Sequence, residues 1–132
     1  MSAVAIKFHT GPVTFAAEAA VKGGQVVEAG TASRSVKPAG AASAKILGVA
    51  LIDAAPADPD TGYAGIPEHT SVAIAPAQVP VVGDGTAAVG DLVIAAAGGK
   101  VAKAAGTEPA SQIVGRVIEV LADNKVSVRL YV

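Results

Sequence analysis

The clearest structural signal in this sequence is KVSVRLYV at residues 125–132. Its apolar residues stand at every second position, and side chains at that spacing point to one face of a β-strand. Asp123 and Asn124 come directly before it and favour a turn. Residues 113–121 and 125–132 are therefore predicted to form a β-hairpin.

Working outward, the other apolar runs are also short, rich in β-branched residues and interrupted by Gly or Pro, a pattern typical of many short strands. The Ala-rich residues 16–21 and 102–105 have helical propensity but are too short to form stable helices. The chain is predicted to be all-β, a compact β-barrel or sandwich of short strands with at most short helical turns. The predicted strands are residues 4–9, 12–16, 25–28, 46–52, 71–75, 92–95, 113–121 and 125–132.

The chain also repeats itself, and the order of the matched pieces is the same in both halves. Two copies of a β unit, each too small to bury its own apolar face, are expected to close into one barrel or sandwich. Gly48 and Gly115, equivalent within the repeat, are expected at a bend or at a tight backbone contact. The matches are 12–13 with 80–81 and 19–21 with 87–89 at an offset of 68, 24–27 with 90–93 at 66, and 46–51 with 113–118 at 67.

This repeat predicts how one domain over residues 1–132 is organised. The first half carries an insertion made almost entirely of turn-forming Pro, Gly and Asp. The predicted segments are an N-terminal arm or edge strand at 1–10, a first pseudo-repeat at 11–52, an inserted loop at 53–69, a strand closing the first half at 70–78, and a second pseudo-repeat at 79–132.

Composition excludes several classes of function. Ten Lys and Arg balance eleven Asp and Glu, and without a basic run nucleic acid is not an expected partner. The absence of Cys rules out disulfides, thiolate nucleophiles and Cys-based metal sites. No membrane is expected, since no stretch reaches the roughly 18 apolar residues of a spanning helix. No secretion signal is recognised, so synthesis in the cytoplasm is expected.

Residues for catalysis or cofactor binding are scarce. His9 and His69 stand without a partner motif. Residues 58–60 imitate the start of a calcium loop, but Tyr63 stands where that loop needs Gly. Residues 98–100 lack the Ser or Thr of a phosphate-binding loop and are expected to form a hairpin turn. The chain is therefore predicted not to be an enzyme, with no catalytic residue, metal, cofactor or small-molecule substrate.

A Pro-Val strand leading to an Ala-Ala-Val-x-Gly-Gly-x-Val-Val turn and an Ile-Leu-Gly-Val-Ala strand carries a resemblance. These pieces are residues 12–13, 19–27 and 46–50, and the second half continues the likeness from Ala88 to the end of the chain. The sequence resembles the small capsid decoration (cement, head-stabilising) proteins of tailed bacteriophages.

The resemblance implies a structural protein without catalytic residues. It implies a β-rich homotrimer on the outer surface of the virion, made in the host cytoplasm. There the protein would bind the major capsid protein near three-fold axes and brace its lattice.

Two other interpretations remain open. The chain is alternatively a small β-barrel ligand-binding or carrier module, for which Lys100 would be the first residue to test. It is alternatively a small subunit whose active site, with His9, His69 and residues 58–60, is shared across an oligomer.

The partner-binding residues are predicted at the N-terminus and in the inserted loop. Residues 2–10 are strand-like but precede the first repeat, and a spare strand can add to the sheet edge of another chain. Alternatively, this strand completes the protein's own sheet. The candidate partner-binding residues are Val4, Ile6 and Phe8 on alternate positions, Lys7 between them, and Tyr63 in the loop.

Overall fold

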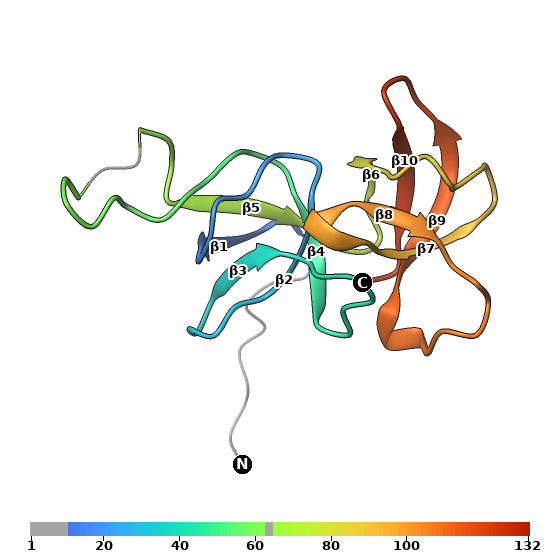
Figure 1. The fold of residues 1–132 in the computed structure, drawn as a ribbon, viewed down its shortest axis with the longest axis horizontal. Coiled ribbons are helices and arrows are strands. Elements are labelled where there is room, and N and C mark those ends of the chain that lie inside the picture. Colours follow the sequence, from blue (N-terminus) through green and yellow to red (C-terminus); the bar gives the residue numbers. More distant parts are fainter. Residues whose placement is uncertain (1–10, 63–64) are drawn as a thin grey trace, which may run out of the picture.

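A computed structural model describes residues 11–62 and 65–132, which are nearly all β and contain no α-helix. Figure 1 shows two groups of strands side by side, with the C-terminus between them. We call the group β1 to β5 the first unit. Its strands are β1 (Val13–Ala17), β2 (Val26–Ala29), β3 (Ser35–Pro38), β4 (Ile46–Ala50) and β5 (His69–Ala73). They form a closed barrel in the order β1-β3-β2-β4-β5, in which β1 also pairs with β5.

The second unit is a five-stranded sheet in the order β6-β10-β9-β7-β8. Its edge strands β6 and β8 approach each other only at a parallel bridge between Gly83 and Val101. Its elements are β6 (Gln78–Val82), β7 (Leu92–Ala95), the 3-10 turn η1 (Ala97–Gly99), β8 (Val101–Lys103), the 3-10 turn η2 (Ala110–Gln112), β9 (Ile113–Val120) and β10 (Lys125–Leu130).

The predicted all-β class and its two pseudo-repeats are confirmed, because the second unit repeats the strand pairing of the first. The antiparallel pairs of β5 with β1 and β4 recur as pairs of β10 with β6 and β9. Likewise, the pairs of β2 with β3 and β4 recur as pairs of β7 with β8 and β9. The predicted hairpin of β9 and β10 is also present, and its turn residues Asp123 and Asn124 both have positive φ, as a type I′ turn requires.

The register corrects the alignment of the first strands. Val13 pairs with Val72, and Val79 pairs with Val128, the equivalent of Val72 in the repeat. Val13 therefore corresponds to Val79 at an offset of 66, and the predicted matches at 68 are wrong by two residues. The following turn agrees, because Lys22 N donates to Gln25 Oε1 at 2.8 Å as Ala88 N donates to Asp91 Oδ2 at 2.8 Å.

The two repeat glycines stand at the predicted tight contacts. Val27 pairs with Gly48 and Val93 pairs with Gly115, and a β-bulge follows in each ladder. A Cβ at Gly48 would overlap the carbonyl oxygen of Ala73, and a Cβ at Gly115 would overlap that of Arg129. Each would also lie 2.8 Å from a Val side chain, so the backbone crossing leaves no room for a side chain at either position.

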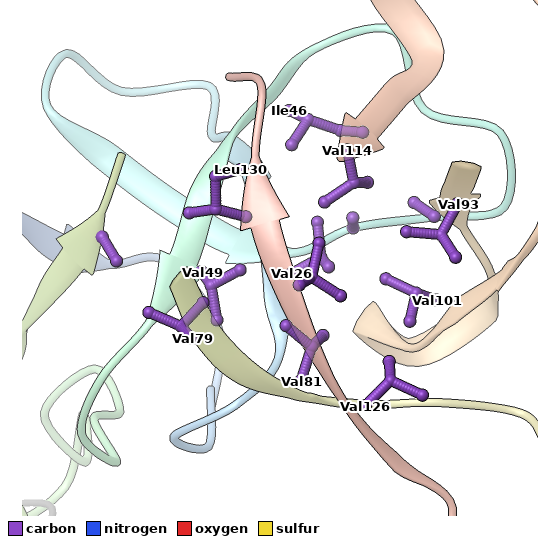
Figure 2. Close-up of a cluster of buried hydrophobic side chains, with 14 of the residues drawn as sticks. Val26, Ile46, Val49, Val79, Val81, Val93, Val101, Val114, Val126 and Leu130 are labelled. Carbon is purple, nitrogen blue, oxygen red and sulfur yellow. The ribbon is translucent and has the colours of Figure 1, made fainter. Parts of the chain in front are cut away.

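Two clusters of buried side chains fill the molecule, and only one of them belongs to a single unit. The first lies within the first unit and consists of Ala17, Val21, Val27, Val36, Ala50, Ala54 and Val72. In the second, Val26, Ile46 and Val49 from the outside of the first barrel pack among the buried residues of the second unit, as Figure 2 shows. The expected single barrel or sandwich takes a particular form: the first unit closes into a barrel by itself, and its outer face covers the second sheet.

Hydrogen bonds fix this contact between the units. Val82 N of β6 donates to Gly24 O at 3.0 Å, and Gln25 Nε2 donates to Gly98 O of η1 at 3.1 Å. Gly99 N donates to Ala39 O at 3.0 Å. The start of β2 therefore lies between β6 and η1, in the gap where the second sheet does not close into a barrel.

Other details differ from the prediction. The strands β3, β6 and β8 were not predicted. The Ala-rich residues 16–21 and 102–105 are not helical, since Ala17 ends β1 and Ala102 lies in β8. The short helical turns are η1 and η2 instead.

Candidate partner-binding surfaces

The residues predicted to bind a partner, namely Val4, Ile6, Lys7, Phe8 and Tyr63, lie outside the described residues, as does His9. Their predicted role is therefore neither confirmed nor contradicted by the fold.

The candidate catalytic and metal-binding residues that are described do not converge. His69 begins β5 with an exposed side chain and pairs with Ala16. The carboxylate of Asp58 accepts a hydrogen bond from Asp60 N at 2.8 Å, so it stabilises its own turn. Within residues 11–62 and 65–132, no group of three His, Asp or Glu side chains is placed to hold a metal ion. No helix in that part of the chain has the length and apolar character to span a bilayer.

The predicted turn at residues 98–100 is a hairpin tip used for internal packing. Gly98 and Gly99 have φ values of 74° and 75°, which favour glycine. A Cβ at Gly99 would lie 2.8 Å from the carbonyl oxygen of Val26. Lys100 follows with an exposed side chain. The tip therefore contacts the first unit closely, which accounts for its glycines without a bound phosphate.

An apolar groove of about 320 Å³ lies where the two units meet. Leu51 borders it with 42% of its surface exposed, and Ile52 beside it is 46% exposed. Gly11, the first described residue, also borders the groove. The lining residues are Gly11, Pro12, Leu51, Ala73, Ile74, Pro76, Ala77 and Val79.

The second unit carries further exposed apolar side chains. Ile118 and Val120 on β9, Val89 before β7 and Tyr131 after β10 are all 42% exposed or more. The guanidinium of Arg116 donates through Nε to Tyr131 Oη at 3.1 Å and through Nη1 to Gly90 O at 2.7 Å. Arg116 thus holds the aromatic side chain of Tyr131 beside the start of β7.

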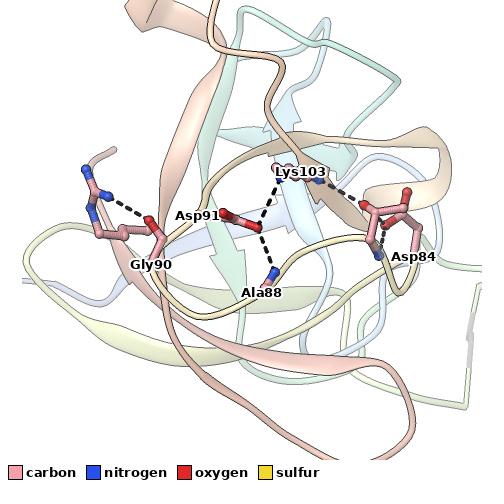
Figure 3. A network of polar contacts seen from close by, with 7 residues as sticks. Asp84, Ala88, Gly90, Asp91 and Lys103 are labelled. Carbon is pink, nitrogen blue, oxygen red and sulfur yellow. Dashed lines mark hydrogen bonds and ion pairs between the residues drawn. The ribbon is translucent and has the colours of Figure 1, made fainter.

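The polar contacts near the start of β7 mostly hold loops in position. Asp91 Oδ2 accepts a hydrogen bond from Ala88 N at 2.8 Å and lies 4.0 Å from Lys103 Nζ, as Figure 3 shows. Asp84 Oδ1 accepts from Thr86 N at 3.0 Å and from its hydroxyl at 2.6 Å. Both carboxylates are therefore engaged in the loops around β7 and β8.

Two further carboxylates have a lowered pKa for the same kind of reason. Hydrogen bonds from the hydroxyl and then the backbone N–H of Thr31 lower the pKa of Glu18. Backbone N–H groups, first that of Ala105, lower the pKa of Glu108. In each case the hydrogen bonds from the loop favour the ionised carboxylate, and the carboxylate in turn fastens that loop.

The comparisons with known proteins agree with a structural role. A family model described as structural cement protein (E217 gp24/Pam3 gp6) matches residues 4–130. A search among curated proteins found no match. The family is that of a phage structural protein, which implies a non-enzymatic role in association with the capsid. The match extends over nearly the whole chain and fits the all-β fold, so the chain belongs to the phage structural cement proteins.

Proposed function

We propose that this protein binds the outside of a phage head as a homo-oligomer, a trimer, and stabilises the lattice of the major capsid protein. The observation that carries the proposal is the family match over residues 4–130. Exposed apolar side chains at the junction and on the second unit support it, because exposed apolar area on a soluble domain marks surfaces that a partner covers. The protein is made in the host cytoplasm and ends in the virion.

The shared core supports treating residues 1–132 as one domain in this role. Val26 and Val49 of the first unit are fully buried in the cluster that the second unit completes. The interior of the first barrel is filled by Val27, Val36 and Val72. A packed interior of this kind favours a structural role over the alternative of a carrier barrel, which needs space for a ligand.

The N-terminal arm is our first candidate for the capsid contact. Gly11, which follows the arm in the sequence, borders the apolar groove, and the candidate residues Val4, Ile6 and Phe8 alternate with Lys7 in the sequence as in an added strand. Tyr63 in the long loop is the second candidate.

Mixing the purified protein with expanded heads that lack it tests the function. We expect the protein to co-sediment with the heads at a saturating stoichiometry and to raise their resistance to heat. Native mass measurement of the free protein is expected to give a trimer. A protein that stays in the supernatant at every concentration would remove the capsid function, and a free monomer would remove the trimer.

Deleting residues 2–9 tests the arm separately. The deleted protein is expected to remain folded and oligomeric but to lose head binding. Full binding by the deleted protein, or its failure to fold, would contradict the proposed role of the arm.

A further inference from the structure

The first unit contacts the second through one face of its sheet, and the sequence repeat places an equivalent face on the second unit. On the first unit this face is formed by outward side chains of β2, β4 and β5, and all of them are buried against the second unit: Val26, Ile46, Val49 and Ala73. The register of the repeat places its equivalent on β7, β9 and β10. We call this second copy the open face, and its residues are Leu92, Ile113, Arg116 and Arg129.

The open face combines apolar area with positive charge. Leu92 and Ile113 are only partly buried. Arg116 replaces Val49 and Arg129 replaces Ala73, and both arginines are exposed. Arginine and tyrosine around an apolar centre are the residues enriched at protein interfaces, and Tyr131 extends from the same edge.

A groove on the open face matches a groove of the first unit that the second unit already fills. Ala104 N donates to Leu92 O at 2.9 Å, as Ala39 N donates to Val26 O at 2.9 Å. In the first unit, the space between Ala39 and the start of β2 receives the Gly98-Gly99 tip. The equivalent groove, about 280 Å³ in volume, is bordered by Asp91, Leu92, Ala104, Gly106, Glu108 and Ile113.

The two charged residues among the four of the open face are both arginines. Asp91 and Glu108, the acids beside the groove, are engaged with backbone N–H groups. Arg116 and Arg129 lie directly opposite each other on β9 and β10, an unfavourable pairing of like charges. Among the residues that the structure describes, the side chain of Arg129 has no hydrogen-bond or ion-pair partner. A bound carboxylate would relieve the repulsion and take a charge-assisted hydrogen bond.

We propose that the open face binds a carboxylate-bearing segment of a partner protein, with a turn of that segment in the groove. This rests on the proposed function, in which the partner is the capsid lattice. A second copy of this chain, docked as the units dock on each other, fits poorly. It would bury Arg116 and Arg129 where the internal contact has Val49 and Ala73, and burying unpaired charge is costly.

Two variants of the full chain test the proposal by different means. Arg129→Glu reverses the charge of the side chain that has no partner, and Lys45→Glu reverses an exposed charge on the first unit as its control. Ala105 also borders the groove, so Ala105→Trp fills it without changing charge, and Ala20→Trp on the first unit is its control. Head binding, native mass and far-UV circular dichroism are measured for all four.

Arg129→Glu and Ala105→Trp are expected to weaken head binding at least about tenfold, with controls unchanged and all masses as in the wild type. Added salt is expected to weaken wild-type binding more than binding by Arg129→Gln. If the wild type binds heads and both variants bind equally well, the proposed role of the open face is wrong, while the proposed function of the protein stands. A reduced oligomer mass in both variants would show that a second copy occupies the face, which also overturns the proposal. Absence of wild-type binding would remove the proposed function itself.

Discussion

The first and second units share a strand order but differ in how the sheet closes. Strand β1 pairs with β3 through two residue pairs, whereas β6 and β8 meet at one bridge. The first unit accordingly has a core of its own, while the buried residues of the second share a cluster with Val26, Ile46 and Val49. A sequence repeat therefore gives two similar ladders without giving two equally independent units, because the second is completed by the outer face of the first.

Separating the units is the strongest test of this difference. We expect residues 78–132 alone to be unfolded, because Val81, Val93 and Val101 would lose the side chains that cover them. Far-UV circular dichroism and proton NMR dispersion measure the outcome, and mixing with residues 1–77 is expected to restore structure. A fragment 78–132 that unfolds cooperatively by itself would refute the dependence.

The repeat glycines test where the units are alike. Gly48→Val and Gly115→Val are each expected to lower the free energy of unfolding by at least about 3 kcal/mol, since each new side chain meets a backbone carbonyl that cannot move away. Urea denaturation measures both. Gly40→Ala is the matched control, because a Cβ there meets only the Glu28 carboxylate at 3.6 Å. A normal urea midpoint for either Val variant would contradict the close contact between that glycine and the carbonyl group of the neighbouring strand.

Two neighbouring residues of β2 allow the two buried clusters to be tested separately. Val26 points into the shared cluster and Val27 into the first barrel, and both are fully buried. Each change to Ala is expected to cost about 2 kcal/mol. Hydrogen exchange is expected to distinguish them: Val26→Ala speeds exchange in β6 to β10 more than in β1 to β5, whereas Val27→Ala speeds it in both. Identical exchange profiles would indicate one undivided core.

The smallest effects are expected at the loop carboxylates, one in each unit. Hydrogen bonding holds the pKa of Glu18 and of Glu108 below the ordinary value of 4.5. A lowered folded pKa stabilises the fold above the unfolded value, and that contribution is lost as pH falls through the folded pKa. Glu18→Gln and Glu108→Gln should thus lower the urea midpoint slightly at neutral pH. The difference from wild type should shrink as pH falls below 4.5, and a difference independent of pH would exclude this cause.

Sequence patterns identified the fold class and the pseudo-repeats because alternation and required glycines have direct physical causes. Gly48 and Gly115 were recognisable, since glycine inside a strand is unfavourable unless a close approach demands it. The offset of the first strand was missed by two residues for an equally physical reason. A shift of two residues keeps every side chain on its own face of the sheet. Val13 can therefore be aligned with Val81 or with Val79 without changing which residues are buried.

Other features were not visible in a single sequence. The strands β3 and β8 are very short, and β6 contains Pro80, which is tolerated because this strand lies at the sheet edge. The open face depends on which side of β7, β9 and β10 stays uncovered, and only the arrangement of the units reveals that. Arg116 and Arg129 appear in the sequence as ordinary exposed charges.

The position of β2 between β6 and η1 also implies an order in which the two units fold during synthesis. Residues 24–26 leave the ribosome before any strand that packs on them, and domains made during translation fold from the N-terminal side. The first unit closes through pairs among its own strands, so the surface that covers the second unit exists before β6 to β10 are complete. The two repeats are therefore not interchangeable in the gene: a chain that delivered the second unit first would leave Val81 and Val93 uncovered until the first unit emerged.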